Sequence, residues 1–381
     1  MKTWIDEAVF PNANRWEEDQ EIPESVLRSL ASRGLFGACL PGNYGGMALD
    51  SLALGAASAE IARGSVSLLS VFVVHAMVSQ ALLRFGDDAQ KNALLPRLAT
   101  GDLRAAFALT EPDFGSDAAN IACAARRGDG GILLNGRKRW ISGSCYADLF
   151  LVFAHLENRG AIALLVPAGT PGLTVRPMDG LLGFRAAGIA ELTFTDCLVP
   201  DMLPFDGAPA SLLGPERGGF VFVASHALDT GRFVIGWGGI GVIEGCLAAS
   251  LAYARERVQF GAPLGSHQLI QEMIADMATG REAARALGMK VAAERDAMTP
   301  DSVMNVSMFK YFSSRACVAA ATQALQLHGG NGCSPDFPIQ RYFRDARIFE
   351  IIEGSSQMQQ MMIASALLKQ GRAARRKRHD S

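Results

Sequence analysis

The sequence lacks any regular arrangement of cysteine. Its seven cysteines are scattered, their number is odd, and no Cys-x-x-Cys pair occurs. This argues against a disulfide framework and against a metal site of the usual zinc spacing, and it favours a reducing compartment. A positively charged start followed by an apolar segment is also missing, so we expect no secretory signal and a cytoplasmic protein.

The sequence also lacks a large excess of charge of either sign. Its formal net charge is -2 over 381 residues, with 49% hydrophobic and 19% charged residues. The body of the chain therefore offers no electrostatic attraction for nucleic acid or an anionic membrane. The composition is that of a soluble globular protein with large cores, and the length predicts two or three packed units.

One hydrophobic run, residues 65–83, is long enough to suggest a membrane span. It contains Ser70, His75, Ser79 and Gln80, and no aromatic or basic belt frames it. We therefore interpret the run as a buried core helix and expect no membrane partner.

The pattern of the chain changes twice. Residues 1–104 have helical periodicity, residues 105–210 form short apolar segments separated by turn residues, and residues 211–371 return to long helical periodicity. This order predicts a multidomain α+β fold with an N-terminal α-helical domain, a middle β-sandwich or barrel domain and a C-terminal four-helix bundle. Strands are expected at 107–110, 131–135, 149–154, 161–166, 173–176 and 190–195, and bundle helices near 220–257, 267–295, 301–328 and 356–370. The basic tail, 372–381, predicts a solvated, disordered end, with nucleic acid or an acidic partner as the alternative.

The segment 340–360 is the strongest candidate for catalytic chemistry. A charged, arginine-rich stretch gives way to an apolar run, and Glu353 follows two isoleucines and precedes Gly354. Apolar neighbours raise the pKa of a carboxyl group towards neutrality, as a general base requires, and a glycine allows close approach of a ligand to the backbone. The alternative is a loop glutamate that caps a helix beginning near Ser355 or Ser356.

Four other segments suit ligand binding, and each has an ordinary structural alternative. Residues 109–117 join a strand to a loop with hydroxyls and glycine, which suits a planar polar ligand or a simple turn. Residues 139–144 place Trp140 where it could stack on an aromatic cofactor or fill a core. Residues 255–268 offer arginine and phenylalanine to a pyrophosphate and an adenine, or basic residues to a helix dipole. Residues 326–332 form a glycine loop whose amides suit phosphate or cap a helix.

A formal Gly-x-Gly-x-x-Gly pattern occurs at residues 236–241. It has no strand–turn–helix context and continues into a helical segment. We therefore interpret it as small residues on a packed bundle helix rather than as a dinucleotide fingerprint.

The order of these motifs resembles that of the acyl-CoA dehydrogenase superfamily over nearly the whole chain. Residues 110–117 (TEPDFGSD) are similar to the TEPxxGSD loop of the family, and residues 138–144 (KRWISGS) to its KxWI segment. The three later motifs are RERVQFG (255–261), QLHGGNG (326–332) and RDARIFEIIEGSSQ (344–357). The resemblance implies FAD as cofactor and a homodimer or homotetramer, because each FAD in this family touches a neighbouring subunit.

The resemblance also implies roles for individual residues. Glu353 would remove the proton α to a thioester carbonyl while the β-hydride passes to flavin N5. The residues expected to line the flavin are Phe107, Leu109, Thr110, Trp140 and Ser142, with Ser116 on the cofactor or substrate side. Those expected to reach the pyrophosphate and adenine of a neighbouring subunit's FAD are Arg257, Phe260, Gln268, Gln326, Gly329 and Gly330. Ser355 and Gln357 would close the FAD site, and Asp229, Arg232 and Gly354 would line the thioester pocket.

Residues 228–270 and 350–358 resemble most the carrier-protein-linked dehydrogenases that make hydroxymalonyl- or methoxymalonyl-type extender units in polyketide pathways. This implies a short acyl group on the phosphopantetheine of an acyl carrier protein. One alternative is a catabolic short-chain acyl-CoA dehydrogenase that feeds an electron-transfer flavoprotein. The others are an oxygen-using flavoprotein, against which the presence of Glu353 argues, and a DNA-associated flavoprotein, which only the basic tail suggests.

Overall fold

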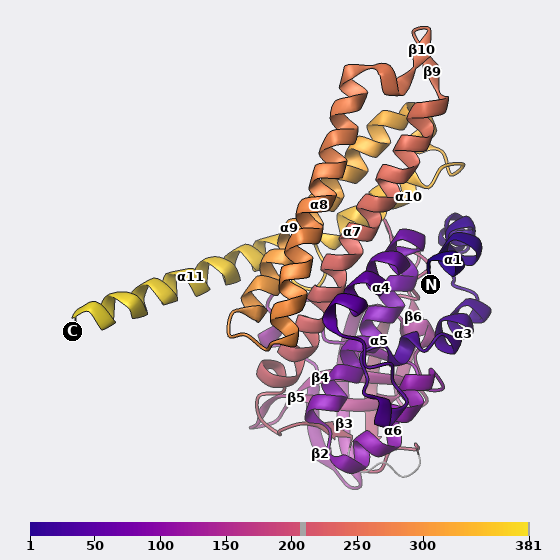
Figure 1. Ribbon diagram of the computed structural model, residues 1–381. Helices are drawn as coiled ribbons and strands as arrows, with labels where there is room; N and C mark the ends of the chain where they lie inside the picture. Colours follow the sequence, from indigo (N-terminus) through magenta and orange to yellow (C-terminus); the bar gives the residue numbers. More distant parts are fainter. Residues whose placement is uncertain (206–210, 380–381) are drawn as a thin grey trace. The chain divides into compact units, whose positions relative to one another are not determined.

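The chain divides into two compact units, each made of several segments of the sequence, and Figure 1 shows the helices and strands that they contain. The computed structural model describes residues 1–205 and 211–379, with side chains described as far as Lys369. The first unit consists of Met1–Asp6, Ser51–Gly64 and Arg232–Ser381, and the second of Glu7–Asp50 and Ser65–Gly231. The predicted middle domain ends at 210, so its last five residues lie outside the described part.

Helices open the second unit, as predicted. They are α2 (Ala13–Asp19), α3 (Glu24–Ser32), α5 (Val66–Phe85) and α6 (Asp88–Thr100). Helix α5 begins where the Ser65 hydroxyl accepts a hydrogen bond from the Leu68 amide, a normal N-cap. His75 in α5 then contacts the Leu98 carbonyl of α6 through Nε2, at 3.1 Å, and accepts the Ala105 amide through Nδ1, at 3.2 Å. The buried histidine thereby ties two helices to the first strand.

Within residues 1–205 and 211–379, two helical segments are long and apolar enough to cross a membrane, Val66–Phe85 and Phe220–Glu256. Their most apolar windows are 89% and 78% buried within the protein, which is typical of core helices. For α5 this agrees with the interpretation from its sequence.

The eight strands found in the described residues of the second unit join one mixed sheet. They are β1 (Ala105–Ala108), β2 (Ala124–Gly128), β3 (Gly131–Ile141), β4 (Leu149–Leu156), β5 (Gly160–Pro167), β6 (Leu173–Pro177), β7 (Ala190–Pro200) and β8 (Leu212–Leu213). The order is β6-β7-β3-β2-β4-β5-β8, and β1 also pairs with β4. Both β1 and β2 pair with β4 in parallel, β1 along residues 149–152 and β2 at residues 155–156, and the other pairs are antiparallel. The β domain is confirmed, with its strands in a single hydrogen-bonded sheet rather than two separate sheets.

In the described part of the second unit, two strands were not predicted, and one expected strand is shifted. In β2 only Ala125 is buried, so the segment lacks the apolar run that marked the other strands, and β8 has only two residues. The strand expected at 107–110 is β1, which ends at Ala108. Leu109 and Thr110 lie in the following loop because their carbonyl groups accept hydrogen bonds from the Lys138 side chain and the Arg139 amide.

Long helices form the first unit. They are α4 (Ser51–Gly64), α7 (Ser225–Glu256, from Arg232 onwards), α8 (Gln268–Asp296), α9 (Ser302–His328), α10 (Ile339–Phe349) and α11 (Ser356–His379), with the three-residue α1 (Lys2–Trp4). The predicted C-terminal helical part is confirmed. Helix α10 was not predicted, because its high arginine content hides a face on which Tyr342 and Phe349 are fully buried. Helix α4, assigned by sequence to the N-terminal domain, packs against α8.

The glycines of residues 236–241 serve helix packing. A Cβ at Gly241 would lie 2.0 Å from the carbonyl oxygen of Ala59 in α4, and one at Gly236 would lie 2.5 Å from the Phe309 ring in α9. The interpretation of this pattern as small residues on a bundle helix is therefore confirmed.

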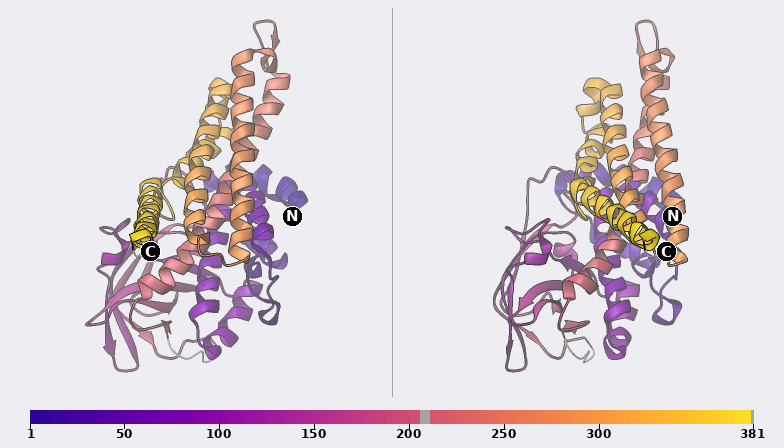
Figure 2. Two further views of the ribbon diagram at one scale, coloured as in Figure 1. Left: turned by 60° about the vertical axis from the view of Figure 1, so that its left-hand side comes forward. Right: turned by 90° about the vertical axis from the view of Figure 1, so that its left-hand side faces the viewer.

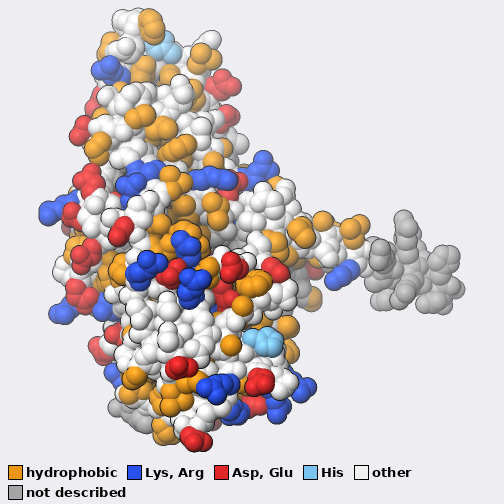
Figure 3. All heavy atoms as spheres, turned by 180° about the vertical axis from the view of Figure 1, so that it is seen from behind, with side chains coloured by type: hydrophobic (Ala, Val, Ile, Leu, Met, Phe, Trp, Pro, Cys, Tyr) orange, Lys and Arg blue, Asp and Glu red, His pale blue; other side chains and the backbone are white. Residues whose placement is uncertain are grey.

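The last helix carries exposed apolar side chains. Met361, Leu367 and Leu368 are exposed, and Figure 3 shows hydrophobic side chains along the described part of α11. The backbone of the tail, predicted to be disordered over 372–381, continues this helix to His379, since alanine, arginine and lysine all favour helix. The side chains of 370–379 and the last two residues lie outside the described part.

Candidate active site

Glu353 lies in the short turn between α10 and α11. Its φ angle is 54°, and that of the following Gly354 is 84°. A glycine adopts this left-handed geometry freely, but a glutamate does so at a cost and only where its surroundings hold it. The turn is closed by a hydrogen bond of 2.8 Å from the Ser356 amide to the Glu350 carbonyl. Backbone strain at the candidate base is a property that functional sites commonly have.

Side chains from three helices hold the turn through its carbonyl groups. The Glu353 carbonyl accepts from Arg232 Nε of α7 and from Gln359 Nε2 of α11, each at 3.1 Å. The Gly354 carbonyl accepts from Lys310 Nζ of α9 at 2.8 Å and from the same Gln359 amide at 3.1 Å. The carboxylate is therefore aimed by its backbone, while its own oxygens take no part in holding the turn.

The environment of the carboxyl group suits a base that works near neutrality. Glu353 Oε2 is buried and has no hydrogen-bond partner within the described part of the chain. Burial raises the pKa of Glu353 to about 7, against the lowering influence of Arg232 and Lys310. The group can therefore both take up and release a proton at ordinary pH.

The alternative role for Glu353, capping α11, is wrong. The cap of that helix comes from Ser355, whose hydroxyl accepts a hydrogen bond of 3.3 Å from the Met358 amide. Ser355, expected to close the FAD site, therefore has a structural role of its own. Gln357 lies exposed in the first turn of α11.

The residues expected around the thioester occupy different places. Arg232 lies beside the Glu353 turn, and Gly354 forms part of it. Asp229 lies one helical turn before Arg232 on α7, within the segment that belongs to the second unit. Ser116 is exposed in the loop that follows β1.

The loop after β1 is fixed to strand β3 by a buried ion pair. Lys138 Nζ lies 2.7 Å from Glu111 Oε1 and donates a second hydrogen bond, of 2.9 Å, to the Leu109 carbonyl. Glu111 also accepts the amides of Ala122 and Cys123, at 2.6 and 2.9 Å. Sequence reasoning did not assign roles to this lysine and glutamate. Charged residues beside apolar strand segments, inside two ligand-binding motifs, were the signal that could have identified them.

Trp140 is not a core residue. Its side chain is 51% exposed, its φ angle is 63°, and the Arg139 guanidinium lies 4.9 Å from its ring centroid. The Arg139 amide donates to the Thr110 carbonyl at 2.9 Å, which places the two motifs side by side. Thr110 and Ser142 are half-buried. An exposed indole with neighbouring hydroxyls fits the flat, polar ring system of a flavin.

Phe107 and Leu109 contribute less surface to this region. Both are buried, and the Phe107 ring packs at 5.2 Å from the ring of Phe153 in β4. Their expected contact with the flavin stays a prediction.

A hairpin projects from the far ends of α7 and α8 (Figures 1 and 2). It consists of β9 (Val258–Gln259) and β10 (Ala262–Pro263), joined by Phe260 and Gly261, which both have positive φ angles. The Phe260 side chain is 97% exposed. Because this ring has no core to fill, it is available to a ligand or a neighbouring subunit. The nearby Arg257 and Gln268 are also exposed.

The glycine loop after α9 begins with Gly329, which caps the helix, and continues with Gly330. Gly329 caps the helix through its amide, which donates to Gln326, and its φ angle is 58°, so the capping alternative is correct for this residue. A Cβ at Gly329 or Gly330 would meet nothing within 4 Å. The space beside both glycines leaves room for a ligand phosphate.

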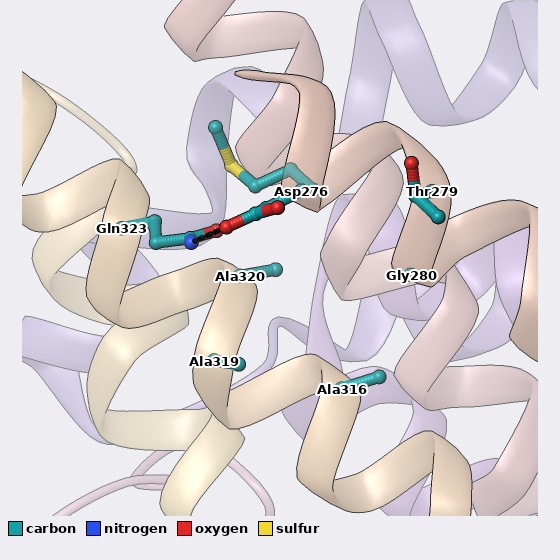
Figure 4. A pocket seen from close by; sticks show the side chains of 8 residues that line it. Asp276, Thr279, Gly280, Ala316, Ala319, Ala320 and Gln323 are labelled. Atoms are coloured by element: carbon teal, nitrogen blue, oxygen red, sulfur yellow. Dashed lines mark hydrogen bonds between the residues drawn. The ribbon is translucent and has the colours of Figure 1, made fainter. Parts of the chain in front are cut away.

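A separate hollow lies between α8 and α9 (Figure 4). Apart from the hydrogen bond of 2.9 Å between Gln323 and Asp276, its lining consists mainly of small side chains. It offers no acid–base pair for the chemistry considered above. Among the described residues, no group of three or more histidine, cysteine, aspartate or glutamate side chains is arranged to hold a metal ion.

Family models cover the chain in three consecutive pieces. The acyl-CoA dehydrogenase N-terminal domain matches residues 1–102, the middle domain residues 106–197 and the C-terminal domain residues 218–368. The chain belongs to the acyl-CoA dehydrogenase family. Members are FAD-dependent oxidoreductases that act on acyl thioesters. The resemblance drawn from the motifs is thus confirmed, whereas the roles of individual residues stay predictions.

Relatives of this chain include acyl-CoA dehydrogenases and proteins whose names refer to an extender unit or an acyl carrier protein. The mitochondrial short-chain specific acyl-CoA dehydrogenase of Homo sapiens is 36% identical over 377 residues, covering 98% of this chain and 89% of its own. Butyryl-CoA dehydrogenase from Megasphaera elsdenii superposes with a TM-score of 0.90 and 31% identity, covering 96% and 95%. FkbI, described as an enzyme for biosynthesis of a methoxymalonyl extender unit, has a TM-score of 0.88 and 30% identity, covering 97% and 99%. The prolyl acyl carrier protein oxidase AnaB has a TM-score of 0.86 and 27% identity, covering 96% and 98%.

Proposed function

We propose that the protein oxidises a short acyl group attached through a thioester to an acyl carrier protein, with Glu353 as general base. The observation that carries the chemistry is the buried, unpaired Oε2 of Glu353 in a strained turn with a pKa near neutrality. The carrier-protein substrate is supported by the similarity to FkbI and AnaB over nearly the whole chain and by the motif resemblance at residues 228–270 and 350–358. The polyketide setting is supported by the same motif resemblance and by FkbI, whose description names a polyketide extender unit.

The base performs its step by proton transfer at a defined atom. Glu353 Oε2 takes the proton α to the thioester carbonyl, and the charge then left on the thioester is stabilised by hydrogen bonds to its oxygen. FAD, when bound, supplies the acceptor for the β-hydride. Arg232 and Gln359 orient the base through the Glu353 carbonyl, so that the carboxyl group meets the substrate in one geometry. Burial limits access of water to Oε2 and keeps its basicity high.

The alternative is a catabolic dehydrogenase that acts on a short acyl-CoA. It is favoured by the 36% identity to the human short-chain enzyme and by the butyryl-CoA dehydrogenase structure. The chemistry at Glu353 is the same in both, so the carrier of the acyl group is the difference to test. For the catabolic enzyme an electron-transfer flavoprotein would be the electron acceptor.

The deciding experiment is anaerobic bleaching of the bound flavin. The purified protein is mixed in parallel with butyryl-CoA and with an acyl carrier protein loaded with a glyceryl or hydroxyacyl group. Bleaching by the loaded carrier protein alone supports the biosynthetic function. Efficient bleaching by butyryl-CoA supports the catabolic alternative. If neither thioester bleaches the flavin, or if the reduced protein consumes oxygen rapidly, the oxygen-using alternative gains support.

A further inference from the structure

We propose that Lys310 is a positioning residue for Glu353. Its ammonium group holds the left-handed Glu353–Gly354 turn through the Gly354 carbonyl and supplies the positive charge that faces the base from α9. The inference rests on the proposed role of Glu353 as general base. It assigns to Lys310 an effect on the orientation and the basicity of that group, without contact with the substrate.

The surroundings of Lys310 are unusual for a lysine. The residue is fully buried in the middle of α9, although lysine is among the residues least often buried without a paired charge. Within the described residues, no carboxylate lies at ion-pair distance from its Nζ. The hydrogen bond to the Gly354 carbonyl, at 2.8 Å, is its one polar contact in that part of the chain. Burying a cation without a paired charge costs free energy. Because the only polar contact of Lys310 Nζ among the described residues is with the Glu353–Gly354 turn, its role is to hold that turn.

The charges around Lys310 come from α7 and from the turn between α10 and α11. Glu353 and Glu350 favour its charged form, while Arg232 of α7 and, above all, burial oppose it, so that the pKa of Lys310 falls to about 8. In return, Lys310 and Arg232 each lower the pKa of Glu353 against the effect of burial. Loss of the Lys310 charge therefore leaves Arg232 as the remaining opposing charge and moves the pKa of Glu353 above about 7.

A comparison with Gln359 separates the effect of Lys310 on the geometry of the turn from its effect on the charge near Glu353. It donates to both carbonyl groups of the turn, yet it carries no charge. Removing its amide loosens the turn without changing the charge near Glu353. Removing the Lys310 ammonium changes both.

The test compares pH profiles of kcat/KM for the FAD-loaded wild type with those of Lys310→Met, Lys310→Arg and Gln359→Leu. Lys310→Met is expected to lower kcat by about 10- to 100-fold, as misplacement of a catalytic group does, and to move the acid limb to higher pH. Lys310→Arg keeps the cation and is expected to keep the limb in place. Gln359→Leu is expected to lower kcat and leave the limb unchanged.

Controls separate this role from simple structural support. Lys290 pairs with Glu294 on the exposed side of α8, so Lys290→Met is a matched loss of a lysine charge and is expected to leave the profile unchanged. The infrared carboxyl band that Glu353→Gln removes gives a second readout, because its titration in Lys310→Met reports the pKa of Glu353 without turnover. Thermal unfolding and flavin content establish that the variants are folded and loaded.

The inference is overturned if the acid limb and the infrared titration of Lys310→Met match those of the wild type. It is also overturned if Lys310→Arg shifts both as far as Lys310→Met. If Lys310→Met does not fold, Lys310→Gln replaces it, with the same shift expected and an unshifted limb counting against the inference. Failure of the proposed function is distinct, since Glu353→Gln would then retain turnover.

Discussion

Lys138 and Glu111 form an ion pair of 2.7 Å with exposed side-chain fractions of 0% and 4%. The pair joins β3, which also contains Trp140, to the loop that carries Thr110. Removing one partner leaves an uncompensated buried charge, so Lys138→Met is expected to lower the free energy of unfolding by about 3–5 kcal/mol and to reduce flavin retention. Thermal unfolding and the flavin-to-protein ratio measure the two effects.

A double variant and an exposed pair provide the controls. Lys138→Met combined with Glu111→Gln removes the stranded charge and is expected to recover part of the lost stability. Disrupting the exposed pair of Arg15 and Asp19 with Arg15→Met is expected to cost less than about 1 kcal/mol. Equal losses from the buried and the exposed pair would contradict the assignment.

Glu353→Gln is expected to lower turnover by about 100-fold or more while FAD stays bound and the fold stays intact. The amide keeps the shape of the side chain but accepts no proton. The matched control is Glu282→Gln, which removes an exposed carboxylate that pairs with Arg281 on α8. Steady-state turnover of both variants checks the prediction, and comparable losses of turnover in the two would contradict the assignment of Glu353 as the base.

The activity is expected to rise with pH through the pKa of Glu353, which burial raises to about 7. Below this pH the carboxyl group is protonated and cannot take the α proton, so kcat/KM is expected to fall by about tenfold per pH unit. A profile that stays level down to pH 5 would show that another group acts as base.

Glu353 is also expected to make stability depend on pH. Because its pKa in the folded protein, about 7, lies above the ordinary 4.5, the folded state binds more protons between these values, and stability falls as pH rises through this window. Glu353→Gln abolishes that fall and is expected to be more stable than the wild type above pH 7, by an upper limit of about 3 kcal/mol. Denaturation at pH 5 and pH 8 measures the difference, and an advantage of the same size at both would contradict it.

Phe260→Ser is expected to leave the stability of the chain within about 0.5 kcal/mol of the wild type, because the ring is 97% exposed. If the ring packs on the adenine of a neighbouring subunit's FAD, the variant loses flavin during gel filtration faster than the wild type. The exposed Met298, in the turn after α8, provides the control as Met298→Ser. Unchanged flavin retention in Phe260→Ser would remove the ring from the cofactor site.

Sequence patterns predicted the helical and β parts because each has a strong period and clear turn residues. They missed β2, whose side chains are mostly exposed, and α10, whose arginines masked its buried face. Motif order identified the family and Glu353. The partners of Glu353 were harder to find, since Lys310 and Gln359 act through backbone carbonyl groups that no residue pattern records. The left-handed backbone of Trp140 and Glu353 is likewise a property of the folded chain.

Helix α4 has a consequence for the order in which the protein is made. Its residues, Ser51–Gly64, leave the ribosome about two hundred residues before α8, against which they pack. The backbone of Ala59 in α4 packs so closely on Gly241 of α7 that no side chain fits between the two helices. During synthesis, the face of α4 that is buried in the folded protein therefore stays unpacked until the C-terminal helices have been made. A nascent chain that stops before them leaves this face exposed to chaperones and to aggregation.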